Sequence, residues 1–281
     1  MDWTRREWLK LGLAAAGASW LPSHKPAAAD QSFSPPNLLF MFPDQWRRQA
    51  FGFMGQDPVL TPHLDRFASQ SRVFTNAVSN CPVCTPFRGM LMTGCYPHRT
   101  GIVTNLEVLG DETALRDDTR TFPQVLRDAG YSTGYLGKWH LSLGKPGDVP
   151  GDPNPWRGGN RAWRHYVAPH RRHGFDYWHA YPGGNKHFSP TYWTNDGGRE
   201  RLEIVERWSP DHEADVAARF IRNDGGHTRV AGRPWALFIG MNPPHPPYNQ
   251  VPPEHQTNYR GRAVAELLNR PNVDLRSMDP K

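Results

Sequence analysis

Three runs of strand length stand out along the chain, and polar residues follow each of them. They cover residues 37–42 (NLLFMF), 131–137 (YSTGYLG) and 235–241 (WALFIGM). A strand that is apolar on both faces is typical of the centre of a parallel sheet, where helices cover both sides. We therefore predict that these three runs form central strands of such a sheet.

Helix-starting and helix-ending signals occur between these runs. Pro86 suits the first turn of a helix, and Gly94 and Gly130 suit helix ends. Strands and helices therefore alternate, which predicts an α/β fold with a mostly parallel central sheet flanked by helices. The expected helices begin at Thr61 and cover about 86–92, 121–129, 209–223 and 262–269, with a further strand over 72–78.

A long segment between the second and third runs has no sustained period. Residues 144–200 are rich in Gly, Pro, Trp, His and Arg. Long connections inside a compact domain are usually functional loops rather than simple linkers. We expect this segment to be an ordered insertion that shapes the rim of a substrate site.

The first 29 residues have the pattern of an export signal. Arg5 and Arg6 precede a short apolar run over residues 11–21, and residues 27–29 (AAA) supply a small-residue cleavage site. The run is too short to span a bilayer stably, so no stable membrane anchor is expected. The paired arginines resemble a twin-arginine signal, which predicts export by the twin-arginine machinery to the periplasm or the medium. An ordinary secretory signal or an uncleaved anchor stays open as the alternative.

Composition limits the classes of partner. The chain has 281 residues, 37% of them hydrophobic and 12% aromatic, which suits one large α/β domain or two smaller ones. A net charge of +6 fits attraction to acidic substrates, but no Lys/Arg block with interleaved aromatics occurs, so nucleic-acid binding is not expected. Cys81, Cys84 and Cys95 are odd in number and lack zinc-site spacing, which predicts at least one special thiol.

Polar side chains follow all three predicted central strands. Asp44 comes just after the first, Lys138 and His140 after the second, and His245 after the third. The carboxyl ends of parallel strands meet at one edge of a sheet, where ligands bind in open α/β folds. Cys84 would add a fourth contribution from the start of a helix, where backbone N–H groups favour negative charge. Each residue alone is weak evidence, but their coincidence at one edge predicts a site.

A short motif adds a family resemblance. Residues 81–89 (CPVCTPFRG) contain a Cys-x-Pro-x-Arg core at Cys84, Pro86 and Arg88. This core resembles the signature of the type I sulfatases, in the alkaline-phosphatase-like superfamily, and the resemblance covers about residues 36–281, which would be their N-terminal catalytic domain. The matching segments are PNLLFMFPDQWR, TPHLDRFASQS, SNCPVCTPFRG, TGCYPHRTG, GYSTGYLGKWHL and MNPPHPPY.

The resemblance implies a modified nucleophile and a metal ion. Cys84 would be oxidised to formylglycine, and Pro86 and Arg88 would be recognised by a formylglycine-generating enzyme. Arg88 would afterwards stabilise the hydrate of the aldehyde. Asp44 and the modified Cys84 would bind a divalent cation, for which Ca²⁺ is expected because hard oxygen ligands suit it.

The resemblance also implies a reaction. Lys138, His140 and His245 would hold the oxygens of a sulfate ester on a sulfated small molecule or carbohydrate. His140 would be the base that releases sulfate from the covalent intermediate, and His245 the acid for the leaving alcohol. An aldehyde hydrate suits this step because its second hydroxyl can lose a proton and expel sulfate. A phosphonate or phosphodiester hydrolase of the same superfamily is the alternative.

Two residues depart from the family pattern. Gln45 stands where many sulfatases have a second aspartate, as in choline-sulfatase-like and phosphonate monoester hydrolase-like branches, and this lowers the negative charge of the metal site. Cys95 stands where the family often has a basic residue. A plain thiol is the main interpretation of Cys95, and pairing with Cys81 stays open.

The end of the family pattern does not occur in this sequence. Family members continue past the RPNV segment at 270–273 and then supply a Ser/Thr-Asp-His/Asn-Gly turn that completes the metal site. Asp274 and Asp279 have no such context. We therefore expect a fragment or the product of a truncated gene, with an unpaired sheet edge and only part of the metal ligands. A truncated product would be an inactive exported module.

Overall fold

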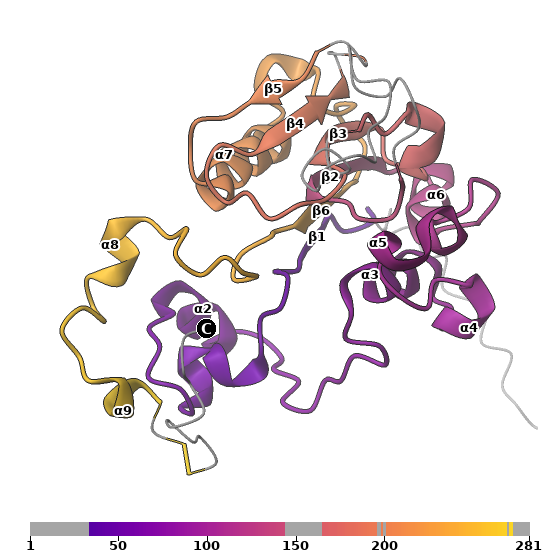
Figure 1. Ribbon diagram of the computed structural model, residues 1–281. Coiled ribbons are helices and arrows are strands. Elements are labelled where there is room, and N and C mark those ends of the chain that lie inside the picture. The colour runs from indigo at the N-terminus through magenta and orange to yellow at the C-terminus, as the bar shows by residue number, and fades with distance from the viewer. Residues whose placement is uncertain (1–33, 144–164, 196–197, 199–200, 269, 272–281) are drawn as a thin grey trace, which may run out of the picture. The chain divides into compact units, whose positions relative to one another are not determined.

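The computed structural model describes residues 34–143, 165–195, 198, 201–268 and 270–271 (Figure 1). A division of the chain after Pro35 leaves Pro36–Lys281 as one compact unit, which holds every element named below. The expected export signal and the first part of the expected insertion lie outside the described residues. Among the helices that are described, none has the length and apolar character needed to cross a bilayer.

Six strands form one sheet in the order β1-β6-β2-β3-β4-β5 (Figure 1). The first four strands of this order are parallel, whereas β4 and β5 pair antiparallel beyond them. The prediction of a mostly parallel α/β sheet is therefore confirmed. The strands cover Leu38–Met41 (β1), Ser132–Lys138 (β2), Tyr177–Tyr181 (β3), Thr191–Thr194 (β4), Glu203–Ile204 (β5) and Trp235–Gly240 (β6).

Helices occupy the connections, and their ends follow local sequence signals. A capping box between Thr121 and Gln124 begins α6, and Gly94 ends α3 with a φ of 68°, a conformation that favours glycine. The α-helices cover Pro62–Ser69 (α2), Cys84–Thr93 (α3), Pro97–Thr100 (α4), Leu106–Leu109 (α5), Phe122–Asp128 (α6), Ser209–Arg222 (α7), Pro253–Gln256 (α8) and Val264–Leu267 (α9). Short 3-10 helices cover Arg48–Ala50 (η2), Gly52–Met54 (η3), Gly110–Thr113 (η4), Pro169–Arg172 (η6) and Asp224–Gly226 (η8).

The sheet lies between two layers of helices (Figure 1). On one face, α3 and α6 pack on the sheet through a cluster that includes Met92, Leu126, Tyr135 and Phe238. On the other face, α7 packs through a second cluster that includes Val216, Phe220, Leu136 and Leu237. Neighbouring residues of β2 and β6 therefore point to opposite cores, which explains why both strands are buried.

Two expectations about secondary structure are wrong, and a third is incomplete. Residues 72–78 form an extended loop and turn, with Phe74 and Val78 largely exposed, because no described strand lies beside them to pair with. The last helix is limited to the single turn of α9. The described part of segment 144–200 is not only a rim, because β3 and β4 extend the sheet there. The aromatic residues of β3 and β4 pair with neighbouring strands. Both strands are too short and too mixed in polarity to form an apolar run in the sequence.

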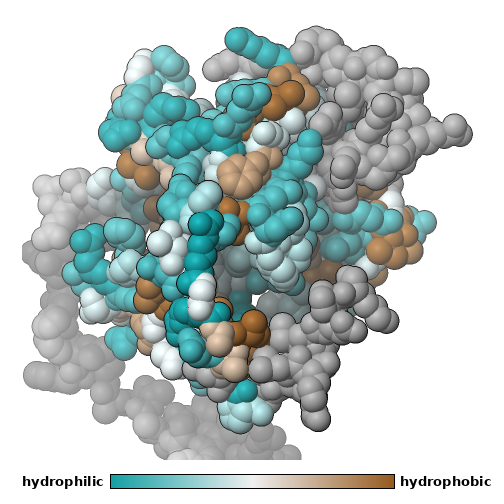
Figure 2. All heavy atoms as spheres, turned by 60° about the vertical axis from the view of Figure 1, so that its left-hand side comes forward, coloured by the Kyte–Doolittle hydropathy of each residue, from teal (hydrophilic) through white to brown (hydrophobic). Residues whose placement is uncertain are grey.

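The position of β1 also differs from the prediction of a central strand. β1 pairs with β6 on one side, and no described strand pairs with its other side. All four of its residues are exposed, Met41 by 53%, and hydrophobic side chains reach the surface at several places on the face drawn in Figure 2. An apolar pattern reports what a strand can bury, but the position of the strand depends on which neighbours pair with it.

Candidate active site

The carboxyl ends of β1, β6 and β2 meet at one edge of the sheet. The backbone N–H of Asp44 donates to Met241 O at 2.8 Å, which continues the β1–β6 pairing beyond both strands. Lys138 is the last residue of β2, and Trp139 N–H donates to Tyr181 O at 2.8 Å just beyond it. Pairing past the strand ends thus brings Asp44 and Lys138 together, although 94 positions separate them in the sequence.

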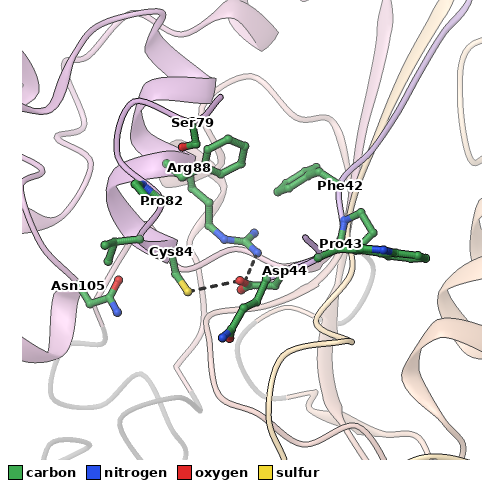
Figure 3. A pocket seen from close by; sticks show the side chains of 12 residues that line it. Phe42, Pro43, Asp44, Ser79, Pro82, Cys84, Arg88 and Asn105 are labelled. Carbon is green, nitrogen blue, oxygen red and sulfur yellow. Dashed lines mark hydrogen bonds and ion pairs between the residues drawn. The ribbon is translucent and has the colours of Figure 1, made fainter. Parts of the chain in front are cut away.

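Asp44 lies between two cations and a thiol. Its Oδ2 is 2.8 Å from Lys138 Nζ and 3.3 Å from Arg88 Nη2, and Cys84 Sγ lies 3.4 Å from its Oδ1. Figure 3 shows the sulfur and the guanidinium pointing toward this carboxylate. Burial opposes ionisation of Asp44, but the charges of Lys138 and Arg88 outweigh it and hold the carboxyl pKa well below its usual range. The carboxylate is therefore charged at any ordinary pH.

The guanidinium of Arg88 lies in a closely fitting cradle, which is formed by Tyr135, the Lys138 carbonyl, Gly240 and the Phe42 ring. Its side chain is 2% exposed, and Nη1 donates to Tyr135 Oη at 3.1 Å and to the Lys138 carbonyl. Gly240 makes room for this contact, since a Cβ there would lie 2.6 Å from Tyr135 Oη and 3.0 Å from Arg88 Nη1. The guanidinium also lies 5.1 Å above the Phe42 ring. Burial raises the pKa of Tyr135 to about 12, so its hydroxyl stays protonated.

Cys84 is the first residue of α3, in agreement with the prediction that it begins a helix. The next backbone N–H, of Thr85, donates to Asn105 Oδ1 at 3.0 Å, which fixes the start of the helix. Burial raises the pKa of the Cys84 thiol, and the carboxylate of Asp44 adds to that effect, although Lys138 and Arg88 oppose it. The thiol is therefore not activated as a thiolate, despite its place at a helix N-terminus.

His140 lies just beyond β2 in a strained backbone conformation, with a φ of 56°. Its ring is buried, and Nε2 lies 3.3 Å from Glu107 Oε1. Burial lowers the pKa of His140 to about 4, an effect that Lys138 and Arg88 strengthen and Glu107 opposes. The imidazole is therefore neutral near pH 7 and able to accept a proton.

His245 lies in the turn that follows β6. Its Nδ1–H donates to Pro246 O at 2.8 Å, which leaves Nε2 as the nitrogen able to exchange a proton. The ligand atoms of His245, Asp44 and Cys84 all lie within 4.8 Å of one another. The structure thus brings His245, which follows β6, close to Asp44, which follows β1.

The three ligand atoms fit a divalent cation in part. Asp44 offers a carboxylate oxygen of the kind that Ca²⁺ prefers, but that ion takes about six to eight oxygen ligands. Asp44 and Cys84 line a pocket with a volume of about 430 Å³. Gln45 also lines this pocket; its side chain is exposed and its backbone has a φ of 59°. The described residues therefore supply one side of a cation site. The pocket is lined by Phe42, Pro43, Asp44, Gln45, Trp46, Ser79, Pro82, Val83, Cys84, Phe87, Arg88 and Asn105.

Sequence reasoning did not identify several residues of the site. Asn242 is fully buried, accepts from Lys138 Nζ at 3.3 Å and donates to Gly184 O at 3.0 Å. Its place directly after a predicted strand could have singled it out. Tyr135, Asn105 and Glu107 had no comparable signal. Cys81, Cys84 and Cys95 are all free thiols, so the open possibility of a Cys81–Cys95 pair is not found.

Comparisons with known proteins agree on one family. Residues 36–272 match the family model described as Sulfatase. An endo-4-O-sulfatase from Bacteroides thetaiotaomicron is 39% identical, with 85% of this chain and 49% of that protein covered. An ulvan-active sulfatase from Formosa agariphila is 31% identical, with 85% of this chain and 40% of that protein covered.

A solved structure from Bacteroides thetaiotaomicron, described under the metabolism of multiple glycosaminoglycans, has a TM-score of 0.79 to this chain at 37% identity. The match covers 85% of this chain and 51% of that one. The chain therefore spans about half the length, or less, of the relatives it matches here.

Proposed function

We propose that this chain, which belongs to the sulfatase family, carries the nucleophile and cation side of an active site that hydrolyses sulfate esters. One observation carries the proposal. Cys84 begins α3 with its Sγ 3.4 Å from Asp44, and the same carboxylate is bound by Arg88 and Lys138. A nucleophile beside two buried cations suits attack on an anionic ester, because the cations offset the negative charge of its oxygens.

The nucleophile in this proposal is formylglycine derived from Cys84. The raised pKa of the thiol supports a modification, since an unmodified Cys84 would be mostly protonated near neutral pH and a weak nucleophile. The side chain CH₂–SH would become CHO, with sulfur leaving as hydrogen sulfide. A formylglycine-generating enzyme would act as partner and use dioxygen as the oxidant. One oxygen atom would enter the aldehyde, and the other would leave as water with two electrons and two protons from a thiol reductant.

The proposed reaction begins with water adding to the aldehyde, which gives a carbon with two hydroxyls. One hydroxyl oxygen bonds to sulfur and releases its proton to solvent, while the bond between sulfur and the alcohol oxygen breaks. His245 gives that oxygen a proton. His140 then takes the proton of the second hydroxyl, the aldehyde re-forms and sulfate leaves with the electrons of the broken C–O bond. The lowered pKa of His140 supports this role, because a neutral imidazole can accept the proton.

A divalent cation, for which we propose Ca²⁺, would be held by Asp44 and by an oxygen of the modified residue 84. When bound, it would supply Lewis-acid stabilisation of the charge on the sulfate oxygens. Arg88 and Lys138 would keep Asp44 ionised and oriented toward it. Lys138, held in turn by Asn242, would bind a sulfate oxygen.

For the substrate we propose a sulfated carbohydrate, and for the place of action the periplasm or the medium. The relatives include an endo-4-O-sulfatase and an ulvan-active sulfatase, and the net charge of +6 suits an anionic substrate. The paired arginines Arg5 and Arg6 support twin-arginine export, which would allow Cys84 to be modified before transport. Gln45 favours a second candidate, a phosphonate or phosphodiester hydrolase, because it lowers the negative charge beside the nucleophile.

The direct test is to co-express the chain with a formylglycine-generating enzyme and to examine the Cys84 peptide by mass spectrometry. We expect sulfur to be replaced by aldehyde oxygen in this peptide and the protein to react with a hydrazide probe. Cys84→Ser should abolish labelling, whereas Cys95→Ser should retain it. A Cys84 peptide that carries only thiol would overturn the proposal, and faster turnover of an aryl phosphonate than of an aryl sulfate would favour the second candidate.

A further inference from the structure

One short segment contacts both the nucleophile helix and His140. Leu106 is 1% exposed and packs with Ala114 and Leu143 in a small core of its own. The residue before it, Asn105, accepts from Thr85 N–H at 3.0 Å, next to the nucleophile. The residue after it, Glu107, places Oε1 3.3 Å from His140 Nε2. The buried leucine therefore anchors a pair of polar side chains that face different parts of the site.

We propose that Glu107 is a positioning residue for His140, and that Leu106 fixes it relative to the helix that begins at Cys84. The proposal rests on the proposed function, because that function uses His140 as its base. It adds a residue that neither the motif nor the strand ends identify. Glu107 does not touch the reacting atoms in this account and acts through the imidazole.

The chemistry of a neutral imidazole makes this contact consequential. One ring nitrogen carries a proton and the other a lone pair, and a carboxylate partner decides which is which. A carboxylate beside Nε2 favours the tautomer with the proton on Nε2, which leaves Nδ1 as the nitrogen that accepts a proton. Glu107 is about 40% exposed on its side chain, so the carboxylate can stay ionised while it holds a buried ring.

The charges around His140 oppose one another in a way that can be tested. Lys138 and Arg88, both buried, disfavour a positive imidazole, and burial acts in the same direction. Glu107 acts in the opposite direction, and contact with His140 in turn lowers the pKa of Glu107 against the effect of burial. Removing the carboxylate should therefore move protonation of His140 to lower pH.

The test uses NMR of the full chain with ¹⁵N-labelled histidine, so that it does not depend on turnover. In the wild type we expect the shifts of a ring with its proton on Nε2. In Glu107→Ala the tautomers should mix and the ring should titrate at lower pH. Glu107→Gln keeps an oxygen acceptor without the charge, so it should keep the tautomer while titrating at lower pH. Glu112→Gln, a substitution at an exposed acid of the nearby η4, is the matched control and should change neither property.

Activity is the second readout for the formylglycine-bearing protein. We expect Glu107→Ala to lower kcat by about 10- to 100-fold with a much smaller change in KM, and Glu107→Asp to restore part of the loss. The acid limb of the pH profile should shift to lower pH in Glu107→Gln. An unchanged tautomer and titration of His140 in Glu107→Ala would overturn the inference. Altered histidine signals in a protein whose Cys84 stays a thiol after co-expression with a formylglycine-generating enzyme would overturn the proposed function and leave the positioning role standing.

Discussion

The two sides of the candidate site differ in how they are supported. On the side of β2 and β6, Arg88 and Lys138 are each 2% exposed, and their polar groups contact Tyr135, Asn242 and backbone carbonyl oxygen. On the side of β1, the strand that leads to Asp44 is exposed along its whole length. Both sides end at the same carboxylate, although only one is enclosed by packed side chains.

This difference in burial separates the positioning of the two cations from the supply of ligands for a metal ion. The sheet and α3 preorganise the two cations, because Asp44 contacts both of them, Tyr135 and the Lys138 carbonyl bind Arg88, and Asn242 binds Lys138. A hard metal ion would need more oxygen ligands than Asp44 offers, and the neighbouring strand edge is open among the described elements. Changes on the β2–β6 side should therefore cost far more stability than equivalent changes on β1.

The largest effect should come from Arg88→Met. Methionine keeps much of the contact with Phe42 but leaves Asp44 with a single cation, and Tyr135 loses one hydrogen bond. We expect the free energy of unfolding to fall by about 3–5 kcal/mol, the range for removing one partner of a buried ion pair. Urea denaturation measures this change. Arg120→Met, which removes an exposed ion pair with Asp128, should cause almost no change, and equal losses in both variants would contradict the comparison.

The next effect should come from Gly240→Ala. The added Cβ would lie 2.6 Å from Tyr135 Oη and 2.8 Å from the Lys138 carbonyl, so the cradle has to shift. We expect a loss of about 1–3 kcal/mol in urea denaturation, which is typical of overpacking. Gly89→Ala in α3 is the comparison, because its Cβ would lie 2.8 Å from the terminal Cδ1 of Ile102, which can move, whereas the Cβ at Gly240 would also meet a backbone carbonyl. A Gly240→Ala protein as stable as the control would show that the cradle is looser than its contacts indicate.

Glu213, a buried carboxyl on α7, allows a test of how stability depends on pH. It is fully buried on α7, its Oε1 accepts from Tyr192 Oη at 2.9 Å, and burial raises its pKa from 4.5 to about 8. The Glu213 carboxyl holds its proton more tightly in the folded state than in the unfolded state. Its contribution to the free energy of unfolding is therefore complete below pH 4.5 and is lost as pH rises toward 8. We expect Glu213→Gln to be more stable than the wild type at pH 8 by about 1 kcal/mol or more, and close to it at pH 5.

Thermal unfolding of Glu213→Gln at several pH values checks this expectation. Glu206→Gln, at an exposed acid in the segment before α7, is the control and should follow the wild type at each pH. If Glu213→Gln lost stability equally at pH 5 and pH 8, the carboxyl would be ionised in the folded protein.

The smallest effect should come from Met41→Ala on β1. Met41 is 53% exposed, whereas Ile239, its partner in the β1–β6 register, is 3% exposed. We expect Met41→Ala to change the free energy of unfolding by less than about 0.5 kcal/mol, and Ile239→Ala to lower it by about 2–5 kcal/mol. Chemical denaturation of the two variants compares β1 with its buried neighbour β6 directly. A large loss in Met41→Ala would mean that β1 is covered in solution.

Local patterns in the sequence identified much of the fold. The ends of β2, β6, α6 and α7 follow apolar runs, prolines and glycines, and these signals act through neighbouring residues only. The pattern failed at residues 72–78 and at β3 and β4, because pairing with a distant strand decides whether a short segment becomes part of a sheet. The edge position of β1 has the same cause, since two apolar faces do not show how many neighbours a strand has.

The sequence by itself indicated which chemical groups to look for at the candidate site. Cys84, Arg88, Asp44, Lys138 and His140 were recognisable from a motif and from their places after strands. Only the tertiary structure decided what each of them contacts, because those contacts join residues far apart in the chain. Lys138 and Arg88 converge on one carboxylate, Gly240 leaves room for a guanidinium, and Glu107 meets His140. Distances and burial set the protonation of these groups, and neither is a property of a local stretch of sequence.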